Sequence, residues 1–290
     1  MDLASLIPLA LKASIFVTVF CLGLNATLED ALYLLRRPSE LLRSLVSMNV
    51  IMPVVAVALA LAFNFHRAVE IALFAFAVSP IPPVFPKKGF KAGGRSPYVI
   101  GLLVAVSLLS IIIVPIAVDL VGRVFGRHTY MAPAAVAQLI FTTVLLPLAA
   151  GMAVRHFAPA FADKIAKPLA LAATIILVAG ALPILFVAWP AISSLIGNGT
   201  IIAIAVFVVI GLAVGHLLGG PDPDDRTVLA LSTATRHPGV ALGIASANAP
   251  GNKLVFAAVL LYLIVNAIVM IPYLNWRKRH HAGVGGTVEI

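Results

Sequence analysis

Long apolar stretches, separated by short polar connections, follow one another along almost the whole chain. Each stretch is close to the ~20 residues that a helix needs to cross the hydrocarbon core of a bilayer. The stretches lie at about 5–26, 45–63, 69–86, 97–121, 131–154, 168–189, 200–218, 227–249 and 254–275. This pattern predicts an all-α, polytopic membrane protein in which nine transmembrane helices form a single domain over residues 1–290.

The composition agrees with a membrane location. Hydrophobic residues make up 61% of the chain and charged residues 11%, and the mean hydropathy is +1.09. Soluble domains are about half apolar and about a quarter charged, so an ordinary soluble enzyme or binding domain is excluded. The chain has one cysteine, Cys21, which rules out an internal disulfide and a cysteine-built metal cluster.

The basic residues are distributed unevenly between the two sides that this segmentation defines. If the N-terminus lies outside, 14 of the 20 lysines and arginines fall on inner connections or the C-terminal tail, and four fall on outer connections. Cytoplasmic loops carry such an excess, so we expect a cell-membrane protein whose tail, residues 276–290, is cytoplasmic. Topology and contact with the lipid bilayer thus explain the net charge of +9, and no nucleic-acid partner is needed.

Two of the nine stretches contain residues that an unbroken helix does not tolerate. The third contains Pro80, Pro82 and Pro83, which remove backbone donors and clash with the preceding turn. The eighth contains Pro238 and Gly239 directly after two polar residues. We therefore expect both spans to be broken helices.

The position of the two breaks predicts an internal symmetry. They are five helices apart, an odd number, so their spans run in opposite directions through the membrane. This arrangement predicts an inverted repeat, with repeat one at about 5–121 and repeat two at about 131–275. Irregular backbone at membrane depth is tolerated where protein buries it or where it lines a cavity, and paired interruptions indicate the binding site of a secondary transporter. The simpler alternative is that the prolines only kink their spans.

Four segments together resemble a known family. The stretch Cys21–Asn25 is followed by the arginine-proline turn Leu34–Pro38 and by Ile51–Pro53, and Ala230–Ala245 contains the second break. In order and spacing these segments resemble the bile acid:sodium symporter family. The resemblance implies two inverted five-helix repeats, arranged as a panel domain and a core domain in which the two broken helices cross. Nine helices would correspond to members that lack the first helix of repeat one.

The chain departs from this family at the positions where the resemblance implies sodium ligands. The first break has Pro80–Pro82 in place of proline-glycine-glycine and Phe85–Pro86 in place of serine-asparagine. In the second, Ser232 and then Arg236–His237 stand where a glutamate and a glutamine-asparagine pair are usual, and a glutamine common in the second helix falls near Met48. Sodium prefers hard oxygen ligands, and most of the expected side-chain oxygens are missing. Sodium coupling is therefore in doubt.

Arg236 is the formal charge closest to the middle of any predicted span. Placing an arginine at the bilayer centre costs roughly 2.5–3.5 kcal/mol on insertion scales, so a partner must offset that cost. Its guanidinium could donate to carbonyls left unpaired at the break, replace the sodium ion of relatives as a tethered cation, or face the cavity and pair with an anionic substrate. We expect the guanidinium to act as a tethered cation, which is compatible with its donating to the free carbonyls. Pairing with the substrate, the third role, favours an organic anion as the substrate.

Other polar side chains near the breaks are candidates for binding the substrate. His237 is either a helix cap or a proton carrier, because imidazole titrates near neutrality. The hydroxyl groups either line the cavity or bond back to their own helices. The candidate set is Arg236, His237, Ser232, Thr233, Thr235, Ser79, Asn25 and Asn266, with no bound metal or cofactor; the coupling ion is left open between sodium, proton and none.

The sequence therefore predicts a secondary active transporter that moves a small organic anion by alternating access. We expect helices three, four, eight and nine to rock against helices one, two, six and seven. An arsenite efflux permease of the same architecture is an alternative, but it would be expected to carry a cysteine at the first broken helix, whereas Cys21 is in helix one.

A membrane enzyme is the second alternative. Asp222, Asp224 and Asp225 resemble one aspartate cluster of an intramembrane prenyltransferase, but such enzymes use two clusters, and this chain has one. A loop that caps the following helix explains these aspartates better. No catalytic residues are predicted.

Overall fold

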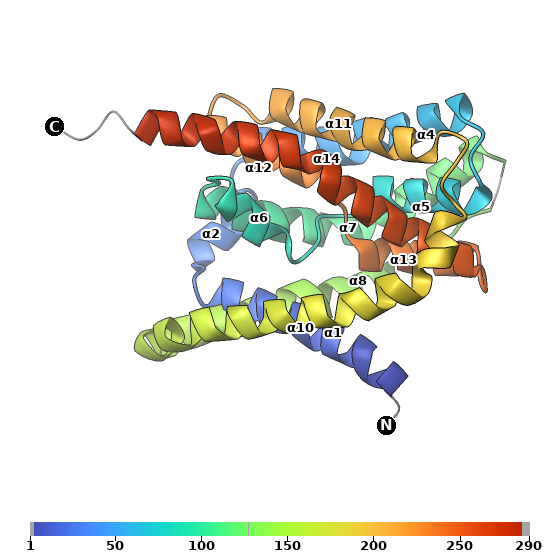
Figure 1. The fold of residues 1–290 in the computed structure, drawn as a ribbon. Coiled ribbons are helices and arrows are strands. Elements are labelled where there is room, and N and C mark those ends of the chain that lie inside the picture. The colour runs from blue at the N-terminus through green and yellow to red at the C-terminus, as the bar shows by residue number, and fades with distance from the viewer. Residues whose placement is uncertain (1–2, 127, 286–290) are drawn as a thin grey trace.

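The computed structural model describes residues 3–126 and 128–285, and all regular elements within those ranges are helices (Figure 1). Within these described ranges, seven helical spans are long and apolar enough to cross a membrane. They are α1 (Leu3–Gly23), α3 (Pro38–Leu45) continued by the π-helix η1 (Val46–Ile51) and α4 (Met52–Ala62), α7 (Ser96–Val124), α8 (Pro133–Ile140) continued by the π-helix η2 (Phe141–Leu145) and α9 (Leu146–Phe157), α10 (Pro159–Ser193), α11 (Thr200–Leu218) and α14 (Lys253–Gly285). The all-helical, polytopic class is confirmed.

The other two predicted spans are each divided into two shorter helices. The third consists of α5 (Arg67–Val78) and α6 (Phe85–Lys91), and the eighth of α12 (Pro223–Ala234) and α13 (Pro238–Asn248). Each division falls on the predicted proline cluster. That these two pairs complete a set of nine membrane crossings remains a prediction.

Several helices begin or end away from their predicted limits. The second span begins at Pro38 rather than near residue 45, and the sixth covers 35 residues from Pro159. A short helix, α2 (Leu28–Leu32), lies between the first and second spans. Residues 276–285 of the expected tail continue α14 as a helix. Hydropathy marks the part of a helix that matches the bilayer, whereas a helix ends only where capping or proline ends it.

The helices form two groups (Figure 1). One group contains α1, α9 and α10, which pack along one another; most of it lies on the opposite side of α6 and α7 from α11 and α14, and α10 also contacts α14. The other contains both broken spans: α11 packs along α12 and α14, and α4 packs on α5 and α11. The second and seventh spans therefore accompany the broken spans, which corrects the expectation that they belong with α1 and α10.

Close backbone contact joins α1 to α9. A Cβ added to Gly151 would lie 2.2 Å from the carbonyl oxygen of Phe20 and 2.9 Å from the Cα of Gly23. Only glycines allow two helices to approach this closely, as at small-residue interfaces of membrane helices. Ser14 adds a hydrogen bond from its hydroxyl to the carbonyl of Ala173 in α10, at 2.6 Å.

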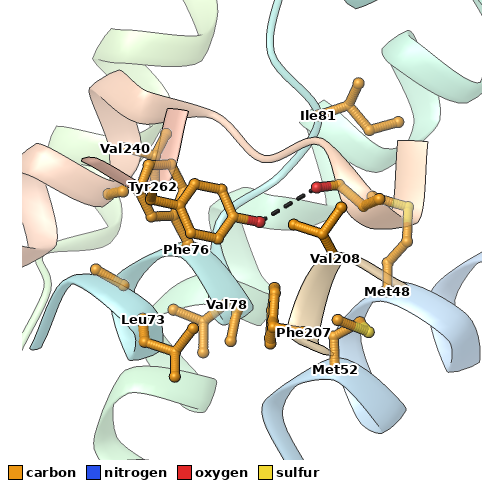
Figure 2. Packing of buried hydrophobic residues seen from close by; sticks show 14 of the residues in the cluster. Met48, Met52, Leu73, Phe76, Val78, Ile81, Phe207, Val208, Val240 and Tyr262 are labelled. Atoms are coloured by element: carbon orange, nitrogen blue, oxygen red, sulfur yellow. Dashed lines mark hydrogen bonds between the residues drawn. The ribbon is translucent and has the colours of Figure 1, made fainter. Parts of the chain in front are cut away.

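The main apolar core surrounds the region where the two broken spans meet. Tyr262 of α14 stacks on Phe76 of α5, with ring centroids 3.9 Å apart, and Phe207 of α11 packs against the Tyr262 ring edge-on. Figure 2 shows these rings beside Met48 and Met52 of the second span. This packing holds four spans around the breaks.

Candidate functional site

The two breaks are in direct contact. The backbone N–H of His237 donates a hydrogen bond of 2.8 Å to the carbonyl of Pro80. The bond joins irregular backbone of the first break to irregular backbone of the second, between residues that are 157 apart in the chain. Both breaks were predicted from the sequence, and the structure brings them together.

The first break follows from its proline run. Ser79 ends α5 in an extended conformation, and its hydroxyl donates to the carbonyl of Phe76 at 3.0 Å. The prolines that follow cannot donate to the preceding turn. The chain becomes helical again at Phe85, whose N–H donates to the carbonyl of Pro82 at 2.9 Å. The extended segment leaves the carbonyls of Ser79 and Pro80 available to other partners.

The second break has a capped restart. Pro238 occupies the first position of α13, where its missing N–H costs nothing. The Nδ1 atom of His237 accepts hydrogen bonds from the N–H groups of Gly239 and Val240, at 3.1 and 3.3 Å. A nitrogen that accepts two bonds is unprotonated, so the proton of the neutral ring is on Nε2. Nε2 is buried and has no partner among the described atoms.

Arg236 occupies the space between the breaks and the second span. Its side chain is 1% exposed, and its guanidinium donates to the carbonyl of Ser79 at 3.1 Å and to the carbonyl of Met48 at 2.6 Å. Within the described structure its third nitrogen, Nε, has no partner. The cation therefore interacts with carbonyl dipoles of two other spans, rather than with carbonyls of the half-helix that precedes it.

The carbonyl of Met48 was not predicted from the sequence as a partner of Arg236. Met48 is buried within η1, the π-helical segment of the second span. A π-helix pairs each N–H with the carbonyl five residues earlier, and the residue five positions after Met48 is Pro53, which has no N–H. The sequence signal for this free carbonyl was Pro53, which follows the buried Met48 by five positions.

The C-terminal end of α12 is held by α14. The carbonyl of Ala234 accepts a hydrogen bond of 2.7 Å from the amide of Asn266 and one of 3.2 Å from the hydroxyl of Tyr262. Asn266 was predicted as a site residue, whereas Tyr262 was missed because its position on an apolar helix is typical of a core residue. The pair satisfies a carbonyl that the break leaves without a helical donor.

The hydroxyl candidates on α12 bond to nearby groups. The Ser232 hydroxyl donates back to the carbonyl of Leu229 at 3.0 Å, and the Thr233 hydroxyl lies 2.7 Å from that of Ser47 in η1. Thr235 donates to the sulfur of Met270 at 3.5 Å. All three are buried. In this conformation Ser232 bonds within α12, whereas Thr233 and Thr235 connect α12 and its C-terminal cap to neighbouring helices.

Asp222 caps α12, and Asp224 and Asp225 lie in the first turn of that helix. Asp222 accepts from the N–H of Asp224 at 2.8 Å, and Asp225 forms an ion pair with Arg95. The hydrogen bond to Asp225 raises the pKa of the Arg95 guanidinium, and burial raises the pKa of the Asp225 carboxyl against the opposing effect of Arg95. Over the described ranges no three acidic, histidine or cysteine side chains are grouped to hold a metal.

Asn25 is separate from the other candidates. Its amide donates to the carbonyl of Cys21 at 2.9 Å, and both residues line a cavity of about 520 Å³ between α1, α6 and α10. Pro83 of the first break and Pro86 of α6 form part of the wall, and Arg236 does not. The candidate residues thus divide between the contact of the two breaks and this cavity, which borders the first break.

Comparisons with known proteins agree with these features. Residues 13–189, more than half of the chain, match the model of the Sodium Bile acid symporter family. A relative from Bacillus subtilis (strain 168), described as "Uncharacterized sodium-dependent transporter YocS", is 29% identical over 154 residues. That match covers 52% of this chain and spans 45% of the relative's length. The family match confirms the resemblance found in the sequence.

Proposed function

Because this chain belongs to the sodium bile acid symporter family, we propose that it is a secondary active transporter that moves a small organic anion across the membrane. In this proposal nine spans form an inverted repeat, in which α12 and α13 cross α5 and α6. The group that contains the broken spans moves against α1, α9 and α10. The substrate site opens alternately to the two sides.

The observation that carries the proposal is the position of Arg236. Its guanidinium donates to carbonyls of Ser79 and Met48, beside the positions where the family resemblance implies sodium ligands. Carbonyl oxygens that stabilise a guanidinium have the chemistry that coordinates a hard cation. We therefore propose that Arg236 replaces the bound sodium ion and keeps the breaks together without it.

The charges at the breaks favour an anion as the substrate. Arg236 contributes a full positive charge, and the N-terminal end of α13 contributes a partial one. The Nε2–H of His237 is a buried donor that has no partner in the described structure, and it is available to a substrate oxygen when the site opens. Ser79, Ser232, Thr233, Thr235 and Asn266 are proposed to complete the site.

Uptake into proteoliposomes tests this function. Anions that raise the unfolding temperature of the purified protein would be selected first, because a ligand bound only to the native state stabilises it. Uptake of the selected anion would then be measured with sodium outside and with potassium in its place. We expect equal initial rates. A rate that collapses without sodium would refute the tethered cation, and the absence of protein-dependent uptake for every stabilising anion would refute the transporter.

A further inference from the structure

The cavity between α1, α6 and α10 contains two lysines that the contact between the breaks does not use. Lys87 follows the first break, at the start of α6, and Lys167 lies on α10. The volume of about 520 Å³ falls within the range of small-molecule sites, roughly 300–1,000 Å³. Two ammonium groups on the wall of one such cavity give it the electrostatic character of an anion site.

The acidic residue nearby does not neutralise this pair. Asp163 also lines the cavity, but its carboxylate forms an ion pair of 2.7 Å with Arg155. The other polar groups on the wall, Thr18 and Asn25, are uncharged. Positive charge therefore predominates among the residues that line the cavity.

Lys87 also connects the two helix groups. Its ammonium donates a hydrogen bond to the hydroxyl of Thr174 in α10. This bond crosses from the element that follows the first break to the group formed by α1, α9 and α10. A hydroxyl is a weaker partner for an ammonium than an anionic oxygen, so an anion that enters the cavity can take this donor from Thr174.

We propose that the anionic group of the transported substrate is recognised by Lys87 and Lys167 in this cavity. This inference rests on the proposed function and adds the residues that select for charge. The substrate is then an organic acid whose carboxylate, sulfonate or phosphate lies between the two ammonium groups. Its remaining atoms contact the prolines that line the cavity, and a second polar group would reach the Nε2–H of His237 only when the site opens, as proposed above. Binding would release Lys87 from Thr174 and loosen the contact between the two groups.

A cysteine on the same wall allows the electrostatic potential of the cavity to be measured before the substrate is identified. Cys21 is the single cysteine of the chain and lines this cavity. Purified protein would be treated with a methanethiosulfonate reagent that carries a sulfonate and, separately, with its trimethylammonium counterpart. The ratio of the two rates would be divided by the ratio for 2-mercaptoethanol, a neutral thiol, to remove the intrinsic reactivity of the reagents.

We expect the corrected ratio of the sulfonate rate to the trimethylammonium rate to be at least about ten, because two nearby ammonium groups attract the sulfonate reagent and repel the cationic one. Lys87→Gln and Lys167→Gln should each lower the ratio about threefold, and the double variant should bring it near unity. Lys87→Arg and Lys167→Arg should preserve the ratio because they retain the charge. Lys164→Gln is the matched control, since Lys164 is an exposed lysine on α10 that does not line the cavity.

A wild-type ratio near or below unity would overturn the proposal, and so would a ratio that the double variant leaves unchanged. Because Cys21 is buried, the neutral methyl methanethiosulfonate would report whether its thiol is accessible; reaction with this neutral reagent and with neither charged one would also overturn the proposal, because the cavity would then admit no charged group. Labelling requires no transport. If the protein shows the lysine-dependent ratio but transports no anion, the anion site is supported and the proposed transport function is refuted. If the protein transports an anion but shows no such ratio, the transport function is supported and the anion site is refuted.

Discussion

A buried guanidinium needs partners for its donors, and Arg236 obtains two of them from backbone carbonyls of other spans. Carbonyl dipoles stabilise the cation without a second charge, so no carboxylate had to be placed in the apolar core. The cost of a buried ion is repaid only when its geometry is well matched. Arg236 therefore contributes mainly to the specific contact between the breaks and the second span.

Arg236→Ala should lower stability and create a response to sodium. Removal of the side chain leaves the carbonyls of Ser79 and Met48 without their donor, at about 1–3 kcal/mol for each unpaired group. Sodium can coordinate free carbonyl oxygens, so sodium chloride should raise the unfolding temperature of the variant more than potassium chloride does. The wild type should show no difference between the two salts.

The control for this prediction is Arg123→Ala, since the Arg123 side chain is 76% exposed and pairs with Asp119 on the surface. Its unfolding temperature should match that of the wild type in both salts. If Arg236→Ala were as stable as the wild type, or if sodium stabilised both proteins equally, the carbonyls would not form a cation site.

At the scale of the element, the contact between α1 and α9 depends on glycine. Gly151→Leu places side-chain atoms where the backbone of Phe20 and Gly23 already lies. Overpacking in a core costs about 1–3 kcal/mol, and a collision with backbone cannot be relieved by a rotamer change. We expect a markedly lower unfolding temperature in detergent. Ala149→Leu, at an exposed position two residues earlier on α9, should leave it unchanged.

The breaks were predictable from the sequence because their cause is local. Pro80, Pro82 and Pro83 cannot continue a helix, and Pro238 with Gly239 restarts one, whatever the surroundings. The limits of the helices were less predictable. Helix α14 continues through Gly285 because the polar residues after an apolar span end its membrane-spanning part without ending its hydrogen bonding.

The partners within the site could not be read from the sequence in the same way. The bonds from His237 to Pro80 and from Arg236 to Ser79 join residues more than 150 positions apart, and such pairs depend on how the spans pack. The grouping of α11 with α12 is also a packing result, because an apolar helix shows no preferred neighbour in its composition. Polarity identified the candidate residues, and tertiary structure determined what each one contacts.

At the scale of the whole molecule, the proposed topology places the two ends of the second broken span on opposite sides of the membrane. Single cysteines would be introduced as Pro221→Cys, before α12, and Asn252→Cys, after α13, in a Cys21→Ser background; both positions are exposed. A membrane-impermeant maleimide applied to intact cells should label Asn252→Cys. It should label Pro221→Cys only after permeabilisation. Labelling of both from one side would show that α12 and α13 do not cross the bilayer.

If Arg236 takes the place of a bound cation as proposed, its covalent attachment determines how membrane voltage acts on a transported anion. A symported anion normally travels with sodium ions that cancel its charge, whereas a guanidinium fixed to the polypeptide cannot leave with the cargo. The anion would then cross alone, and a potential of 100 mV contributes about 2.3 kcal/mol per elementary charge. With the cell interior negative, that voltage expels anions, so the exchange of a dissolved cation for a tethered one would favour export by the proposed transporter.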